Sequence, residues 1–310
     1  MNHIMVTGAT GFIGSSLVRR LIKDGVEVTA LVRDVTKAKV CIRGVKDQSI
    51  FYYVWDNSVS ALAEYMKEKQ VDCVVHLATR YITRSSWEDI DDLVESNITF
   101  GMKILEAMRI AGVRNMVNSS TSWQHYQNEP YNPVNIYAAT KQAYEDILKY
   151  YTDAEGIRTI ILEIYDTYGP FDERNKILNC WKKAGKKNEV IALSPGEQKL
   201  DYVYIEDVLD GIILAVQKLE QPVITAEGYE AKYALSTEEV YSLKELAEIF
   251  EEVYGKKIPV IWGGREYRER EVMEPYRRLE RLPGWNTKYD FRSGLIKMKE
   301  SEQVKDDAHG

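Results

Sequence analysis

The chain has 310 residues, of which 45% are hydrophobic and 29% are charged, and its formal net charge is −7. This length suits one large α/β unit or a nucleotide-binding domain that carries a smaller second lobe. The negative charge argues against a nucleic-acid-binding protein, because phosphate binding needs a basic face. No apolar run is long enough to span a bilayer, which argues against a membrane protein.

The cysteines and histidines limit the class further. Cys41, Cys73 and Cys180 are odd in number and far apart, which suits reduced thiols. The four histidines show no metal-ligand spacing, so we expect no metal site. The first residues contain no basic region followed by an apolar stretch, so we expect a cytoplasmic protein without a secretory signal.

Up to about Gly169, short apolar runs alternate with longer helical patterns. The run Cys73–Leu77 is apolar at nearly every position, as in a parallel strand buried on both faces. This alternation predicts an α/β fold with a doubly wound parallel sheet. The expected strands are His3–Val6, Glu27–Val32, Ile50–Val54, Asp72–Leu77, Met116–Asn118 and Thr159–Ile164, and the expected helices are Phe12–Lys23, Val59–Lys69, Asp91–Ala111 and Asn135–Ala154.

After Gly169 the pattern loosens, and helical stretches mix with short strands. We expect residues 1–169 to form the nucleotide-binding domain, residues 170–300 to form mainly a smaller, interleaved substrate lobe, and residues 301–310 to be a frayed polar tail. The elements expected here are the helices Asn175–Lys183, Ile205–Lys218 and Ser242–Tyr254 and the strands Val190–Leu193, Tyr233–Leu235 and Ile258–Ile261.

A glycine-rich loop directly follows the first strand. Gly8 permits the tight turn, Gly11 lets the backbone approach a pyrophosphate, and Gly14 lets the helix pack closely on the strand. The helix that follows offers unpaired N–H groups to phosphates. This pattern predicts a Rossmann-type dinucleotide site, with the cofactor residues Gly8, Thr10, Gly11, Phe12, Ile13 and Gly14.

The end of the second strand selects the cofactor. An NAD enzyme usually has an acidic residue there, which binds the adenosine ribose. This chain has Val32 at that position, followed by Arg33, whose guanidinium can pair with a 2′-phosphate. We therefore expect NADP (NADPH). The alternative is that Arg33 is a solvated surface residue and that Asp34 binds the ribose.

Tyr137 and Lys141 are four residues apart on an expected helix and so share one face. A nearby ammonium favours the phenolate, so we expect Lys141 to lower the tyrosine pKa toward neutrality. Such a tyrosine can exchange a proton with a carbonyl or alcohol oxygen. Tyr and Lys at this spacing are frequent by chance, and the alternative is that the two residues only form part of an ordinary amphipathic helix face.

The segment Asn118–Trp123 ends the strand before this helix. Together with the glycine loop and the Tyr/Lys pair, it resembles the extended short-chain dehydrogenases/reductases, also called the NAD-dependent epimerase/dehydratase family. The resemblance implies that Thr121 binds the reacting oxygen, that Tyr137 exchanges the proton, and that Lys141 also holds the nicotinamide ribose.

The same resemblance assigns further cofactor contacts. It places Asp56 near the adenine, Leu77 and Ala78 under the cofactor, and Asn97 on the long helix. Without the resemblance, His76 in this stretch is simply a core histidine.

On the substrate side, Asp166 stands where the family usually has Asn, and Leu200 replaces an arginine that commonly touches the diphosphate of the ligand. We expect Arg270 to supply the missing cation. The sugar pocket is expected to include Arg80, Trp123, Gln124 and His125, although His125 can equally be a polar loop residue.

The expected reaction modifies the sugar of a nucleotide-sugar. Thr121 is followed by Ser122 and Trp123, neither of which can act as the acid and base of a dehydratase. Arg33 favours a reductase, and three segments (122–126, 131–137 and 166–170) resemble CDP-abequose and CDP-paratose synthases, which are NADPH-dependent 4-ketoreductases. The alternatives are a nucleotide-sugar 4-epimerase and, more remotely, a non-catalytic NADP-sensing regulator. Relatives commonly pair through two long helices, so we expect a homodimer.

Overall fold

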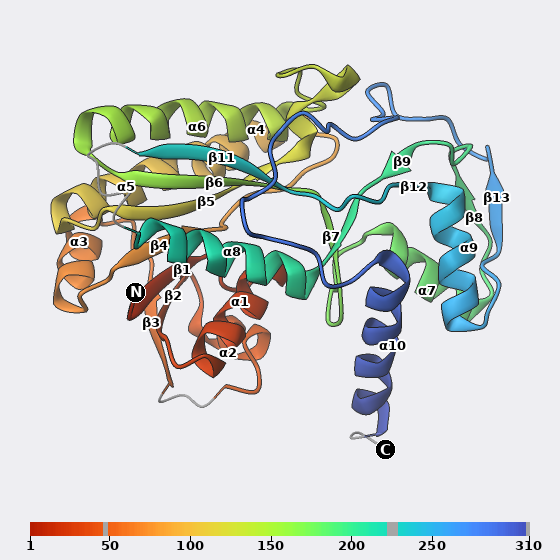
Figure 1. The fold of residues 1–310 in the computed structure, drawn as a ribbon, viewed down its shortest axis with the longest axis horizontal. Helices are drawn as coiled ribbons and strands as arrows, with labels where there is room; N and C mark the ends of the chain where they lie inside the picture. The colour runs from red at the N-terminus through yellow and green to blue at the C-terminus, as the bar shows by residue number, and fades with distance from the viewer. Residues whose placement is uncertain (46–48, 222–228, 308–310) are drawn as a thin grey trace.

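The computed structural model describes residues 1–45, 49–221 and 229–307. Its centre is a seven-stranded parallel sheet with the strand order β11-β6-β5-β4-β1-β2-β3 (Figure 1). The strands are β1 (His3–Thr7), β2 (Glu27–Val32), β3 (Ile50–Val54), β4 (Cys73–His76), β5 (Asn115–Thr121), β6 (Arg158–Ile164) and β11 (Glu230–Leu235). The doubly wound α/β fold expected from the sequence is confirmed.

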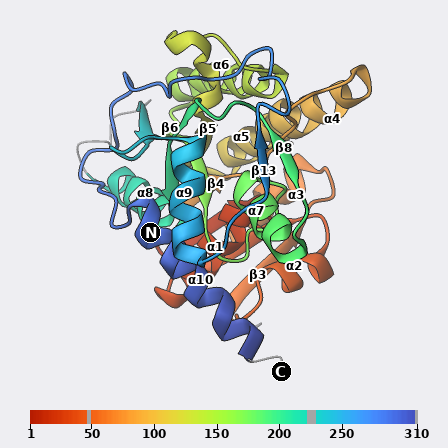
Figure 2. The same ribbon diagram turned by 90° about the vertical axis from the view of Figure 1, so that its right-hand side faces the viewer.

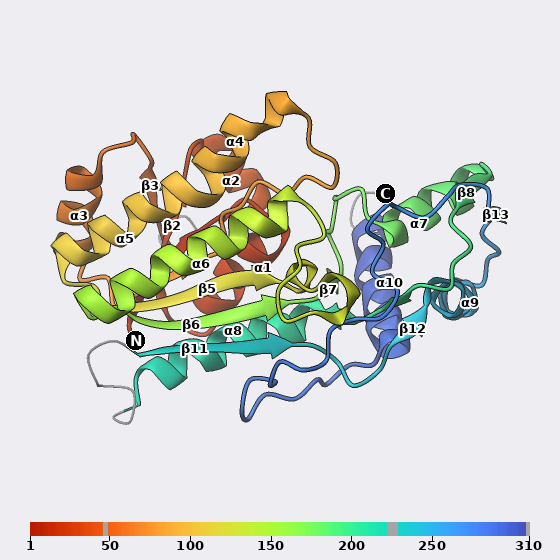
Figure 3. The same cartoon turned by 90° about the horizontal axis from the view of Figure 1, so that it is seen from above.

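Helices cover both faces of this sheet, as Figure 3 shows from above. Each face buries one apolar cluster, which explains why β1 and β4 are buried at every position. One face carries α3 (Val59–Glu68), α5 (Phe100–Ala111) and α6 (Ile136–Glu155), and the other carries α1 (Phe12–Lys23), α2 (Val35–Cys41) and α8 (Ile205–Leu219).

A smaller lobe lies beyond the carboxyl ends of the strands (Figure 1), and it faces the viewer in Figure 2. It contains the helices α7 (Ile177–Lys187), α9 (Leu243–Tyr254) and α10 (Phe291–Asp307). Three two-stranded ladders accompany them: β7 (Asp166–Tyr168) with β10 (Tyr202–Tyr204), β8 (Ile191–Leu193) with β13 (Val260–Trp262), and β9 (Lys199–Leu200) with β12 (Tyr241–Ser242). The chain returns from this lobe to the main sheet through α8 and then β11, before it enters the lobe again at β12.

The long helix expected over Asp91–Ala111 has three parts. It consists of α4 (Ile90–Val94), a π-helical turn (Glu95–Thr99) and α5, and a short 3₁₀ turn (Trp87–Asp89) precedes it. The extra residue of a π-turn changes which side chains face inward, and here Asn97 becomes buried.

The segment from Ser301 onward, expected from the sequence to be a frayed tail, begins as part of a helix. Helix α10 continues through Asp307, and residues 308–310 lie outside the described part. Glu302 anchors this end of the helix, because it accepts a hydrogen bond from Lys182 at 2.7 Å and one from Tyr254 at 3.4 Å. Across residues 1–45, 49–221 and 229–307, every helix is too short or too polar to cross a lipid bilayer.

Candidate active site

A cavity of about 840 Å³ opens at the carboxyl ends of the parallel strands. Its walls come from the segments that follow β1, β2, β3, β4, β5 and β6 and from the start of α6. This is the edge at which doubly wound sheets bind their ligands. The glycine loop forms one end of the cavity, and Tyr137 and Trp123 lie in its lining with Thr121.

The glycine loop packs too closely against neighbouring backbone to accept side chains at Gly8 and Gly14. Gly8 has a φ of +68°, and a Cβ there would meet the Leu77 and Ala78 backbone at 2.7 Å. A Cβ on Gly14 would lie 2.2 Å from the Gly8 carbonyl oxygen. The N-cap of α1 is Gly11, which has no side chain to cap the helix. The first N–H groups of α1 are therefore available to an anion, and the loop fits a dinucleotide.

Arg33 and Asp34 leave β2 in different directions. Arg33 is exposed and lines the cavity, and within the described residues it forms no ion pair or hydrogen bond. The Asp34 carboxylate instead caps α2, where it accepts a hydrogen bond from the Lys37 backbone N–H at 3.0 Å. Capping satisfies a helix end and directs this carboxylate away from the cavity.

The residues expected near the adenine and under the cofactor also line the cavity. Asp56, Leu77 and Ala78 line it, as do Thr10, Phe12 and Ile13. His76 does not: it is 1% exposed, and its Nδ1 is 2.9 Å from the Thr7 hydroxyl. Burial, reinforced by Lys141, lowers the pKa of His76 to about 3, so it is a neutral core histidine.

The expected catalytic residues are Thr121, Tyr137 and Lys141, and the structure brings the first two, but not Lys141, to the cavity lining. Thr121 ends β5, and its Oγ1 accepts a hydrogen bond from the Trp123 N–H at 3.3 Å. Tyr137 lies in the first turn of α6, whose N-cap Asn135 accepts from Ala138 N–H at 3.0 Å. Lys141 follows one turn later and is 2% exposed. Strand β5 and helix α6 thus bring Thr121 and Tyr137 to the same cavity wall.

The protonation of this group differs from expectation. Burial raises the pKa of Tyr137 to about 12, whereas the hydroxyls of Thr121 and Thr79 oppose the change. The expectation that Lys141 brings the pKa of Tyr137 toward neutrality is not met. Burial destabilises the phenolate by more than the neighbouring groups stabilise it. Burial also lowers the pKa of Lys141 to about 8, a change that Glu145 opposes and Lys232 reinforces.

Aromatic and basic side chains form the end of the cavity beside Tyr137. Tyr81 packs edge-on against Tyr137 at 5.2 Å and lies 5.5 Å from the Trp123 ring. The Lys176 ammonium lies 4.8 Å from the Tyr81 ring centre and 3.2 Å from Asp166. Sequence reasoning missed Tyr81, Lys176 and the nearby Arg174, which lie on loops outside any recognisable motif.

Asn97 is not brought to the cavity wall. Its amide oxygen accepts from the Thr79 hydroxyl at 3.0 Å and from the Arg80 N–H at 2.6 Å. Its amide nitrogen donates to the Arg80 carbonyl at 3.1 Å and to the Thr140 hydroxyl at 2.9 Å. With both donors and both acceptor positions occupied, Asn97 fixes the loop after β4 to α6.

Four expected substrate residues also lie away from the cavity lining. Arg80 is exposed, 4.0 Å from Asp92. Gln124 is fully buried and His125 is 5% exposed, because the short turns 122–124 and 126–128 direct them behind β5. The Arg270 guanidinium lies 4.2 Å from the Tyr126 ring centre and binds Asn132. Of the six residues expected at the substrate, Trp123 and Asp166 line the cavity.

Known proteins share both sequence and fold with this chain. CDP-abequose synthase of Yersinia pseudotuberculosis is 31% identical, with 88% of this chain and 91% of the relative covered. UDP-glucuronate 4-epimerase of Thermodesulfobacterium geofontis is 28% identical over 95% of this chain and 94% of the relative. A UDP-glucose-4-epimerase from Stenotrophomonas maltophila, solved with bound NAD, superimposes with a TM-score of 0.84 at 19% identity and covers 99% of this chain and 100% of that one.

The family model named "NAD dependent epimerase/dehydratase family" matches residues 4–226, which include the glycine loop, Thr121, Tyr137 and Lys141. The identity to CDP-abequose synthase extends beyond that match into the smaller lobe. The chain therefore belongs to the NAD dependent epimerase/dehydratase family, the extended type of short-chain dehydrogenase/reductase.

Proposed function

We propose that the protein uses NADPH to reduce the C4 keto group of a nucleotide-linked, CDP-linked 4-keto-deoxyhexose. The observation that carries the proposal is Arg33, a cation that lines the cofactor cavity without a protein partner in the described chain. The CDP assignment rests on the likeness to CDP-abequose synthase, which is 31% identical in one species and 25% in another.

Arg33 favours NADP over NAD for a physical reason. A planar guanidinium can donate two parallel hydrogen bonds to the 2′-phosphate of NADP. NAD has a ribose hydroxyl there, which is best matched by a carboxylate. Val32 supplies none, and the Asp34 carboxylate caps α2. The glycine loop would hold the pyrophosphate, and Lys141 would hold the nicotinamide ribose.

Tyr137 is suited to donate a proton. Its pKa of about 12 keeps the phenol protonated at neutral pH, as reduction of a ketone to an alcohol requires. The Thr121 hydroxyl, on the same wall, would bind the reacting oxygen and stabilise the negative charge that develops on it. When bound, NADPH supplies the hydrogen and electron pair added at C4. Trp123 and Asp166 would contact the sugar.

A second candidate is an NAD(P)-dependent nucleotide-sugar 4-epimerase. It is favoured by the 28% identity to UDP-glucuronate 4-epimerase and by structural neighbours solved with NAD. An epimerase must take a proton from the sugar as well as return one, and a buried phenol with a raised pKa suits the first task poorly. The remote alternative, a non-catalytic NADP-sensing regulator, would not need Thr121, Tyr137 and Lys141.

The test is incubation of the protein with NADPH and a CDP-linked 4-keto-6-deoxy or 4-keto-3,6-dideoxy sugar. Stoichiometric loss of NADPH absorbance, with a single C4 epimer formed, is the expected result. No loss with any 4-keto sugar, together with interconversion of C4 epimers of a saturated nucleotide-sugar, would establish the epimerase instead.

We further propose a homodimer that pairs through α4, α5 and α6. These helices expose large apolar side chains on the outside of the molecule: Val94 at 42%, Met102 at 40%, Ile110 at 52%, Ile136 at 48% and Tyr150 at 59%. Apolar side chains gathered on neighbouring helices mark an interaction surface. The proposed place of action is the cytoplasm, where Cys41, Cys73 and Cys180 would stay reduced.

A further inference from the structure

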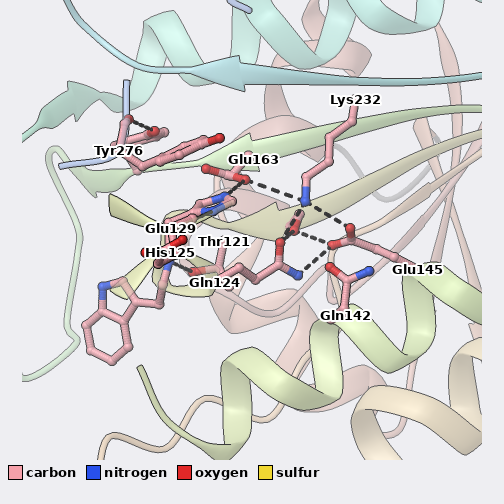
Figure 4. Close-up of polar contacts among 12 residues, drawn as sticks. Thr121, Gln124, His125, Glu129, Gln142, Glu145, Glu163, Lys232 and Tyr276 are labelled. Carbon is pink, nitrogen blue, oxygen red and sulfur yellow. Dashed lines mark hydrogen bonds and ion pairs between the residues drawn. The ribbon is translucent and has the colours of Figure 1, made fainter. Parts of the chain in front are cut away.

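One buried carboxylate joins the strand that carries Thr121 to the helix that carries Tyr137 (Figure 4). Glu145 lies on α6, about two turns beyond Tyr137, and is 6% exposed. Its Oε1 accepts a hydrogen bond from the Ser120 hydroxyl and another from Gln124 Nε2 at 3.0 Å. Thr121 lies between these two donors in the sequence, so Glu145 holds the chain on both sides of the expected catalytic threonine.

Lys232 completes this arrangement from β11, the strand at one edge of the sheet. Its ammonium donates to Glu145 Oε2 at 3.0 Å and to Gln124 Oε1 at 2.6 Å. The fully buried Gln124 amide therefore bridges Glu145 and Lys232. A buried carboxylate is stable only where it is paired and hydrogen-bonded, so Lys232 balances the charge that Glu145 brings into the interior.

A second buried pair fixes the chain just after Gln124. His125 Nε2 lies 2.8 Å from Glu163 Oε2, and His125 Nδ1 lies 3.0 Å from the Glu129 carbonyl oxygen. The His125 ring also stacks on Tyr276, with 3.9 Å between the ring centres. The turn that follows Thr121 is thus held from α6 through Gln124 and from β6 through His125.

The position of the Thr121 hydroxyl matters for the proposed reaction. Thr121 and Tyr137 line the same cavity wall, where both hydroxyls would meet one substrate oxygen. A misplacement of about 1 Å can cost on the order of a hundredfold in rate. Hydrogen bonds to an ionised carboxylate are short and about twice as strong as those between neutral groups, so they are well suited to hold the end of β5 against α6.

We propose that Glu145 is a positioning residue: by binding Ser120 and Gln124 it sets the place of the Thr121 hydroxyl relative to Tyr137, and Lys232 balances its charge. The inference rests on the proposed function in one respect, namely that Thr121 and Tyr137 act on the same substrate oxygen. It predicts an effect of Glu145 on the rate that passes through Thr121 and does not pass through the affinity for ligands.

Glu145→Gln and Ser120→Ala test the inference in the NADPH-dependent assay. A glutamine has one acceptor oxygen and an amide that donates, so it cannot accept from Ser120, Gln124 and Lys232 together. We expect Glu145→Gln to lower kcat about tenfold, with the KM for the sugar and the Kd for NADPH within about twofold of the parent. Ser120→Ala removes one donor and keeps the other two partners of the carboxylate, so it stays informative if Glu145→Gln fails to fold. It should lower kcat about threefold.

A double-mutant cycle shows whether the effect passes through Thr121. Thr121→Val removes the hydroxyl, keeps the branched shape and should itself lower kcat about a hundredfold. If Glu145 acts by placing that hydroxyl, Glu145→Gln should change kcat by less than about twofold in the Thr121→Val background. A general loss of structure would instead lower kcat equally in both backgrounds. As a control, Glu252→Gln removes a 62% exposed carboxylate in the smaller lobe and should leave every constant unchanged.

The methyl group of Thr121 gives a readout that needs neither substrate nor cofactor. In protein labelled with ¹³C at threonine methyl groups, the Thr121 signal is assigned by its loss in Thr121→Val, and its order parameter reports how firmly the strand end is held. We expect the order parameter to fall in Glu145→Gln and in Ser120→Ala and to stay unchanged in Glu252→Gln.

The outcomes separate the inference from the proposed function. An unchanged Thr121 signal in Glu145→Gln and Ser120→Ala would overturn the inference, as would a loss of kcat that persists in full in the Thr121→Val background. If the Thr121 signal responds as expected but the parent does not turn over the CDP-linked sugar, the positioning role of Glu145 stands and the proposed function fails.

Discussion

Arg33→Ala tests the cofactor assignment at a single side chain. Arg33 is exposed, lines the cavity and has no protein partner in the described chain, so its removal breaks no internal contact. The substitution should therefore leave the fold intact and change only what the cavity binds. We expect the parent to prefer NADPH over NADH and the variant to lose most of that preference.

The size of the effect follows from the exposure of the guanidinium. A hydrogen bond to a charged group contributes about 1.5–3 kcal/mol where it is protected from water. Solvent exposure and salt screening weaken the hydrogen bond of Arg33 to the phosphate, and we expect it to contribute about 1.4 kcal/mol to NADPH binding. That value corresponds to about tenfold tighter binding of NADPH than of NADH in the parent. In Arg33→Ala, NADPH binding should weaken about tenfold, whereas NADH binding should stay nearly unchanged.

Titration of each cofactor by fluorescence or calorimetry gives the two dissociation constants. Asp34→Asn is the matched control, because asparagine can still cap α2 and the preference should not change. Arg292→Ala removes a half-exposed arginine in the smaller lobe and should be silent. Equal affinities of the parent for NADPH and NADH would refute the reasoning, as would a loss of NADH binding in Asp34→Asn with no effect of Arg33→Ala.

Three further predictions concern catalysis, stability and assembly. Tyr137→Phe should keep NADPH binding and lose nearly all turnover, whereas Lys141→Ala should damage both; turnover within a few-fold of the parent in Tyr137→Phe would place the proton donor elsewhere. His76 has a folded pKa of about 3 against about 6.5 when unfolded, so the unfolded chain binds more protons between these values and stability falls as the pH drops below about 6.5. Denaturant titrations should show about 2 kcal/mol less stability at pH 5 than at pH 7 from this residue, and His76→Asn should remove that component; an unchanged pH slope would contradict it. The parent should sediment as a dimer of the 35.7 kDa chain at micromolar concentration, and Met102→Lys should shift it toward monomer; a monomeric parent would count against the proposed interface.

The elements of the sheet domain could be predicted closely because their sequence signals are local. The bounds expected for α1, β2 and β3 are the observed ones. Strands buried on both faces are apolar at nearly every position, and α1 begins directly after the glycine loop. The glycine loop, Thr121, Tyr137 and Asp166 reach one cavity for the same reason, since each follows or ends a strand or begins a helix at the same sheet edge.

The residues that were missed or misplaced depend on contacts between distant segments. Gln124 and His125 follow a motif in sequence, but Glu145, Glu163 and Lys232, from three other elements, draw them behind β5. The π-turn that buries Asn97 leaves no periodicity signal, because one extra residue shifts the whole pattern. Helix α10 and its anchor Glu302 follow from packing against α7 and α9, which the polar composition of the tail conceals.

The fate of the cofactor's hydrogen tests the central proposal most directly. The protein is incubated with NADPH carrying deuterium at the transferred position of C4 of the nicotinamide and with a CDP-linked 4-keto-6-deoxy or 4-keto-3,6-dideoxy sugar. Mass spectrometry and NMR of the product then locate the label. A reductase places one deuterium at C4 of the sugar for each NADPH consumed, in a single configuration, and this is the expected result. Recovery of unlabelled sugar epimers with the NADPH pool unchanged would contradict the account.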